Sequence, residues 1–216
     1  MSLDSSTRIL AIRHGETEWN RASRIQGHTD IGLSALGLLQ AERLAHALQD
    51  EAIDAVYASD LARAQQTASP LLRLRPELPP LQLDVGLRER GFGEFEGLTW
   101  QEIADKWPSH SERWRRRDAD FGPPGGETLA DFYRRSVEAV QRLAQAHPGQ
   151  TVVVISHGGV LDCLYRASTG QSLQAPRSWV LANAAINRLL YASEGFGLIG
   201  WHDCAHLDGL ALDEAG

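Results

Sequence analysis

The chain has 216 residues, of which 43% are hydrophobic and 23% are charged, and its 28 acidic residues outnumber its 21 Lys and Arg residues. Ordinary apolar content and a modest net charge of −7 exclude an intrinsically disordered chain. The acidic balance also argues against nucleic acid as a partner, because sequence-independent binding requires a basic face. Any anion that the protein binds must therefore be held by a local group of cations.

The chain has too few cysteines for a disulfide framework or a four-cysteine zinc site. Cys163 and Cys204 are expected to be reduced and buried or half-buried. The start of the chain, residues 1–8, is polar and lacks the apolar core of a secretory signal, and no uncharged apolar run approaches the ~20 residues of a membrane helix. The sequence thus predicts a cytoplasmic protein with no membrane partner and no bound metal.

Short apolar runs and helical patterns alternate in the first half of the chain. Strands are predicted over residues 9–12, 55–59 and 81–85. A helix is predicted over residues 33–50 with Ser34 as its N-cap, and a second helix from about Leu61 that ends before Pro70.

A Gly-, Pro- and Trp-rich stretch, about residues 90–126, separates the two halves and predicts an irregular insertion with one or two short helices. After it, Thr128 opens a long helix that ends before Pro148. Residues 151–155 are all β-branched, and four of the five are aliphatic, as in a strand covered on both faces. A helix over 158–168 and strands over 184–191 and 198–202 follow.

This alternation of strands and helices predicts an α/β layered fold with a mostly parallel sheet. No repeat, linker or change of composition divides the chain, so residues 1–216 are expected to form a single domain. The tail, about residues 203–216, is expected to be loosely held.

Arginine and histidine residues fall where predicted strands end. Arg13 and His14 follow the first strand, Arg63 lies in the first turn of the helix after the second, and His157 follows the 151–155 strand. Ligands of open α/β sheets bind beyond the carboxyl ends of the strands, where helix N-termini present free N–H groups. The pattern therefore predicts a pocket for a phosphoryl group. Taken singly, these residues have structural interpretations, such as an ion pair between Arg63 and Asp60.

Several linked motifs are similar to those of the histidine phosphatase superfamily, also called the phosphoglycerate mutase-like family. They are Arg13-His14-Gly15-Glu16-Thr17-Glu18-Trp19-Asn20, Gln26-Gly27 with Leu33-Ser34, the segment 59–67, the segment 87–97, Pro124-Gly125-Gly126-Glu127 and Ser156-His157-Gly158-Gly159. They stand in the family's order over nearly the whole chain. The resemblance implies a three-layer α/β/α sandwich with a mostly parallel central sheet.

The resemblance also implies a role for each matching residue. His14 would be the nucleophile that becomes a transient phosphohistidine, and Glu89 would be the proton donor. Cations and polar groups would surround the phosphoryl oxygens, namely Arg13, Arg63, His157, Asn20, Gln26, Gly27 and Gly158. Glu16 is expected to be a structural partner of an arginine, and Glu94 a supporting or substrate-side acid.

The insertion is expected to cover the pocket. It contains an arginine-rich run, Arg113 and Arg115 to Arg117, which is interpreted either as a solvated face or as a grip on the anionic remainder of a substrate. Trp100 and Trp107 are expected to wall the substrate side.

The favoured function is a phosphomonoester hydrolase acting on a small phosphorylated metabolite. Gly159 stands where the family's mutases have Asn, and the stretches 89–93 and 97–100 lack the mutases' Tyr and Lys. The alternatives are a cofactor-dependent phosphoglycerate mutase, which alone would need 2,3-bisphosphoglycerate, and a non-catalytic phosphate-binding or partner-binding module. The physiological substrate is left open, as is the oligomeric state, with a homodimer as one alternative.

Overall fold

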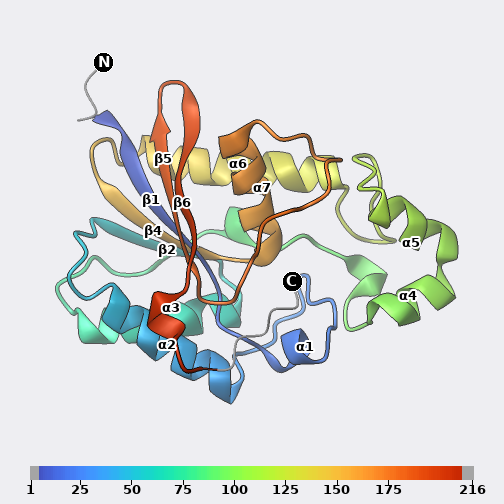
Figure 1. Cartoon of the computed structure of the whole chain (residues 1–216), viewed down its shortest axis with the longest axis horizontal. Coiled ribbons are helices and arrows are strands. Elements are labelled where there is room, and N and C mark those ends of the chain that lie inside the picture. Colours follow the sequence, from blue (N-terminus) through green and yellow to red (C-terminus); the bar gives the residue numbers. More distant parts are fainter. Residues whose placement is uncertain (1–4, 211–216) are drawn as a thin grey trace.

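The computed structural model describes residues 5–210 and is built around a six-stranded sheet (Figure 1). The strands are β1 (Thr7–Arg13), β2 (Ala55–Ala58), β3 (Gln82–Leu83), β4 (Thr151–Ser156), β5 (Ile186–Ala192) and β6 (Gly195–Asp203). Their order is β3-β2-β4-β1-β5-β6; the first four are parallel, and β5 and β6 are antiparallel to their neighbours. The mostly parallel sheet predicted from the sequence is confirmed.

Helices cover both faces of this sheet. Helices α2 (Ala35–Ala47) and α3 (Ala62–Leu74) pack on one face, and α6 (Leu129–Gln145) and α7 (Gly158–Thr169) pack on the other (Figure 1). Successive residues of β1 face opposite layers, so that Leu10 and Ile12 join the α2–α3 core while their neighbours join the α6–α7 core. The structure is therefore the three-layer α/β/α sandwich that the resemblance implied.

The insertion forms a separate flap beside the sheet. Its helices are α4 (Trp100–Lys106) and α5 (Pro108–Arg115), which lie away from the strands in Figure 1. A small aromatic core around Phe95, Ile103 and Phe121 holds them. The remaining short elements are α1 (Glu18–Arg21), η2 (Val85–Leu87), η3 (Gly93–Phe95) and η4 (Ala205–Leu207). Within residues 5–210, no helix combines the length and the apolar character needed to cross a membrane.

Two sequence-based expectations are corrected. Helix α3 continues through Pro70, because Pro70 and Leu71 are buried in the core and this packing outweighs the missing backbone hydrogen bond. The predicted loose tail begins with an anchored segment, since Leu207 in η4 is fully buried and η4 packs on α2. Residues 211–216 of that tail lie outside the described residues.

Candidate active site

The carboxyl ends of β1 and β4 bring two histidines together. The parallel register pairs Arg13 with Ser156, and the His14 N–H donates to the Ser156 carbonyl at 2.9 Å. Consequently the His14 and His157 rings lie 5.2 Å apart between centroids. Arg63 lies in the first turn of α3, the helix that follows β2, and its side chain reaches the same place. The convergence expected at this edge of the sheet is observed.

His14 is held as a neutral ring with one defined nitrogen facing away from the backbone. It is 3% exposed, and its Nδ1 lies 2.7 Å from the Gly15 carbonyl oxygen, to which it donates. Burial, followed by the Arg63 and Arg13 charges, holds the pKa of His14 well below its ordinary value, although the bond to Gly15 opposes this. With the proton on Nδ1, the Nε2 lone pair is unprotonated at neutral pH.

The Arg63 side chain is fully buried, but not all of its N–H groups are bound to protein. Its Nε donates to His157 Nδ1 at 3.2 Å, and its terminal nitrogens donate to the carbonyls of Thr29 at 3.0 Å and Gly27 at 2.7 Å. Three of the five guanidinium N–H groups are thus used, which leaves two. Asp60 does not pair with Arg63, because both of its oxygens accept hydrogen bonds from Arg88.

His157 presents an unused donor. Because its Nδ1 accepts from Arg63, its proton lies on Nε2, which is buried and has no hydrogen-bond partner within residues 5–210. Burial, and then the neighbouring Arg63, His14 and Arg13, lower the pKa of His157 well below its usual value. The ring is therefore a neutral N–H donor.

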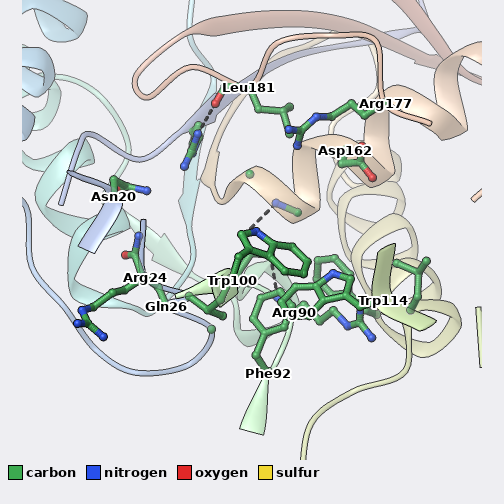
Figure 2. A pocket seen from close by; sticks show the side chains of 18 of the residues that line it. Asn20, Arg24, Gln26, Arg90, Phe92, Trp100, Trp114, Asp162, Arg177 and Leu181 are labelled. Carbon is green, nitrogen blue, oxygen red and sulfur yellow. Dashed lines mark hydrogen bonds between the residues drawn. The ribbon is translucent and has the colours of Figure 1, made fainter. Parts of the chain in front are cut away.

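A cavity of about 600 Å³ opens above these groups (Figure 2). The predicted site residues that line it are Arg13, His14, Asn20, Gln26, Gly27, Arg63, Glu89 and Gly158. His157 is absent from the lining and is buried against His14 and Arg63. Gly158 lies against the Arg13 side chain, and a Cβ there would lie 3.4 Å from Arg13 Nε, which is an ordinary contact distance.

Glu89 is fixed at the cavity wall by two backbone donors. Its Oε1 accepts from the Arg90 N–H at 2.8 Å, and its Oε2 accepts from the Gly159 N–H at 2.9 Å in the first turn of α7. A Cβ at position 159 would lie only 2.1 Å from Glu89 Oε1. Glycine at this position is therefore required for the observed placement of the carboxylate.

The remaining predicted residues border the cavity with their polar groups partly engaged. Arg13 donates to the Leu181 carbonyl through Nη1. Asn20 Oδ1 accepts from both the N–H and the hydroxyl of Thr17, each at 3.0 Å, which caps α1. Gln26 Oε1 is buried and has no hydrogen-bond partner within the described part of the chain.

Four residues that support the site carry no recognisable sequence signal. Asn183 donates to the His14 carbonyl, Thr67 accepts from the Gly15 N–H, Gln40 accepts from the Glu16 N–H, and Glu96 accepts from the N–H groups of His28 and Thr29. Gln40 and Asn183 are isolated polar residues outside the motifs. Thr67 and Glu96 belong to the 59–67 and 87–97 motifs, but nothing in those motifs indicates that they bind the backbone of Gly15 and of the 27–29 loop.

Two expectations about acidic residues are wrong. Glu16 binds no arginine in the part of the chain that the structure describes; its buried carboxylate accepts from the Ser34 hydroxyl at 2.7 Å, at the N-terminus of α2. Glu94 is exposed and does not line the cavity. The supporting acid is Glu96, two residues further along the chain.

The aromatic wall of the cavity also differs from the expectation. Trp100 lines it as predicted, but Trp107 packs against Phe95 inside the flap. Trp114 lines the cavity instead, with its ring centroid 4.2 Å from that of Trp100. Figure 2 shows Trp100, Trp114 and Phe92 clustered on one side of the cavity.

The arginine run divides between the solvated face and the cavity. Arg113 pairs with Asp118 and Arg116 with Glu112, both outside the cavity lining. Arg117 lines the cavity and pairs with Asp162 at 2.7 Å. Arg115 lines the cavity, and its side chain forms no hydrogen bond or ion pair within residues 5–210.

A second lining arginine, Arg177, shares this property, although no motif or strand end singled it out. It lies in the loop between α7 and β5 and forms no hydrogen bond or ion pair with the described residues. As for metal binding, residues 5–210 bring together no group of three or more His, Cys, Asp or Glu side chains suited to an ion.

Known proteins resemble this chain along nearly its whole length. The family description that matches residues 9–204 is the Histidine phosphatase superfamily (branch 1). A metal-independent phosphoserine phosphatase of Arabidopsis thaliana is 36% identical over 97% of this chain and 87% of its own, and a probable phosphoglycerate mutase GpmB of Yersinia pestis is 32% identical over 95% and 97%. The solved structure of Bacillus stearothermophilus YhfR matches 94% of this chain and 100% of its own with a TM-score of 0.86 and 31% identity.

Proposed function

This chain belongs to the histidine phosphatase superfamily and is a phosphomonoester hydrolase, and we propose that His14 carries the phosphoryl group between substrate and water. The observation that supports this role most directly is the bond from His14 Nδ1 to the Gly15 carbonyl. It leaves Nε2 as an unprotonated nucleophile facing the phosphate pocket. In the first step Nε2 forms a bond to phosphorus as the ester oxygen leaves with its electron pair.

Two arginines and one neutral N–H donor around His14 would stabilise the charge that the transferring phosphoryl group spreads over its oxygens. Arg63 has two N–H donors beyond those bound to protein, Arg13 lines the same cavity, and His157 has a buried Nε2–H. Because burial and hydrogen bonds fix Arg63 and His157 beforehand, they need little reorganisation during the reaction.

Glu89 would act as the general acid in the first step and as the general base in the second. Its carboxyl group donates a proton to the departing alkoxide, which leaves as the alcohol. The resulting carboxylate then accepts a proton from water while the water oxygen attacks phosphorus on His14, releasing inorganic phosphate and restoring the ring. The backbone N–H groups of Arg90 and Gly159 fix the carboxylate in position for both steps.

For the substrate, we infer a small phosphomonoester whose alcohol part bears a second anionic group, such as a carboxylate. The curated relative acts, by its name, on phosphoserine. In this chain Arg115 and Arg177 line the cavity without a protein partner, and an anion would complete their hydrogen bonding. The two free thiols are consistent with a cytoplasmic enzyme.

Other relatives are named as probable phosphoglycerate mutases, so isomerisation is the competing activity. Arg90, one of the residues that line the cavity, is 4% exposed and donates to the carbonyls of Phe121 and Glu127. Burial lowers its pKa to about 10, and the nearby Glu127 and Glu89 oppose the shift. Its Nε and Nη2 thus hold the flap, while Nη1 forms no hydrogen bond within residues 5–210 and Arg90 lines the cavity. Arg90 therefore does not decide between the two activities, and the phosphatase name of the curated relative favours hydrolysis.

The test combines turnover and trapping. Purified protein should hydrolyse p-nitrophenyl phosphate in excess EDTA, and acid quenching during turnover of a ³²P-labelled substrate should recover acid-labile label on His14. The His14→Ala variant should lose at least about 10⁴-fold in kcat and carry no label. An unlabelled wild-type ring would refute the covalent route, and conversion of 3-phosphoglycerate to 2-phosphoglycerate with 2,3-bisphosphoglycerate faster than hydrolysis would establish a mutase.

A further inference from the structure

The peptide group that joins Gly15 to Glu16 is bound on both sides. Its carbonyl oxygen accepts from His14 Nδ1 at 2.7 Å, and its N–H donates to Gln40 Oε1 at 2.8 Å. The C=O and N–H of a trans peptide point in opposite directions across one rigid plane. His14 and Gln40 therefore lie on opposite sides of a single planar group that connects them.

Helix α2 is shaped to receive this segment. Ser34, Gly37 and Gln40 follow one another at intervals of three residues and share a face of the helix. The Ser34 N–H donates to the Glu16 carbonyl at 2.8 Å, and a Cβ at Gly37 would lie 2.0 Å from that same oxygen. The missing side chain at Gly37 lets the backbone after His14 rest on the helix, within reach of Gln40, which is 1% exposed.

We propose that Gln40 is a positioning residue that fixes the tautomer of His14 through this peptide group. The proposal rests on the phosphoryl-carrying role of His14. By accepting the Glu16 N–H, Gln40 holds the peptide plane at the angle that directs the Gly15 carbonyl to His14 Nδ1. A peptide that donates through its N–H is also more polarised, so its oxygen is a stronger acceptor.

This support should matter more as the reaction proceeds. When Nε2 bonds to phosphorus, the ring gains positive charge and its Nδ1–H becomes a charge-assisted donor. The bond to the Gly15 carbonyl then strengthens, so a peptide plane that is held at the correct angle stabilises the ring more as the reaction proceeds. Gln40 does not line the cavity, so its effect should fall on the rate of phosphohistidine formation and leave the dissociation constant of the substrate unchanged.

Two substitutions separate positioning from packing. Gln40→Met keeps the length of the side chain and removes the acceptor, whereas Gln40→Glu keeps an acceptor oxygen in either protonation state. Rapid-quench measurements with p-nitrophenyl phosphate should show phosphohistidine forming about tenfold more slowly in Gln40→Met, and Gln40→Glu should restore the rate to within threefold of wild type.

The second readout is ¹⁵N NMR of the His14 ring, which distinguishes the two neutral tautomers without turnover. Wild type and Gln40→Glu should show the proton on Nδ1, and Gln40→Met a mixture of tautomers. Leu44→Ala is the control, because Leu44 is buried in the same helix and forms no side-chain hydrogen bond to the 14–16 segment. It should lower the melting temperature without changing the tautomer.

A Gln40→Met variant that keeps the Nδ1 proton and phosphorylates within twofold of wild type would overturn the proposal. Equal losses in Gln40→Met and Gln40→Glu would overturn it too, since they would indicate a packing role. Failure of the proposed function is a separate result, namely a wild-type His14 that never carries phosphate, whatever tautomer the NMR spectrum reports.

Discussion

The site has two regions that are built in opposite ways. At the sheet edge, His14, Arg63 and His157 are at most 3% exposed, and hydrogen bonds to neighbouring groups orient them. On the flap side, which forms the rim of the cavity with Trp100 and Arg115, Trp100 is 43% exposed and the Arg115 side chain has no partner among the described residues. The difference indicates that chemistry is assigned to a buried, preorganised set of groups and substrate selection to an accessible rim.

The largest effect within this comparison should come from Glu89, which links the two regions. Glu89→Gln keeps one of the two acceptor oxygens that bind the Arg90 and Gly159 N–H groups, and it cannot donate the proton that an alkoxide needs. Hydrolysis of alkyl phosphates should fall about 10²–10⁴-fold. Hydrolysis of p-nitrophenyl phosphate, whose leaving group needs no proton, should fall less than tenfold. Equal losses with both substrates would exclude the proton-donor role.

Arg63→Met should come next, because it removes a buried donor from the sheet edge. We expect kcat to fall about 10²–10³-fold for every phosphomonoester tested. The melting temperature should fall as well, since the carbonyls of Gly27 and Thr29 lose their donors. A variant with normal kcat and a raised KM would indicate that Arg63 contributes to substrate binding and not to the chemical step.

The rim is tested by two neighbouring arginines. Arg115→Met should raise KM for phosphoserine about tenfold, leave kcat unchanged and have no effect on p-nitrophenyl phosphate, which has no second anionic group. Arg116→Met is the matched control, because Arg116 lies outside the cavity lining and pairs with Glu112 in solvent. If both variants change KM alike, the effect is one of overall charge and not of a contact in the cavity.

The smallest expected effect is on stability as a function of pH. Burial, then Arg63 and Arg13, lower the pKa of His14 below its ordinary 6.5, so that below about pH 6.5 the unfolded chain binds a proton that the folded protein does not. Stability should be level with respect to this group above pH 6.5 and fall below it, by up to about 1.4 kcal/mol per pH unit. Denaturant unfolding at pH 7.5 and 5.5 should show a smaller fall in His14→Ala than in wild type, whereas identical falls would contradict the assignment.

The strongly patterned parts of this structure were predictable from sequence. Hydrophobic runs predict buried β-strands such as β4. The geometry of parallel sheets then predicts that reactive residues at strand ends, such as His14 and His157, lie at the same edge. The loop residues of the phosphate pocket, Gln26 and Gly27, came from motif resemblance. Local rules failed where tertiary packing decides, as in the continuation of α3 through Pro70.

The supporting groups were not predictable for a different reason. Gln40, Thr67 and Asn183 each make one hydrogen bond to the backbone beside His14, and such a bond depends on the docking of distant segments. The same holds for the flap, where side-chain direction decides that Trp114 and not Trp107 faces the cavity. Residue type and spacing do not contain this information.

The segment 181–184 has a consequence for how the enzyme becomes active during its synthesis. The Leu181 carbonyl accepts from Arg13, Asn183 donates to the His14 carbonyl, and the Ala184 N–H donates to the Arg13 carbonyl at 2.9 Å. Arg13 and His14, which are synthesised early, thus gain part of their hydrogen bonding from residues synthesised near the end of translation. A nascent or truncated chain that stops before residue 181 should be catalytically silent, and a split enzyme cut in the preceding loop should regain turnover only when its two fragments reassociate.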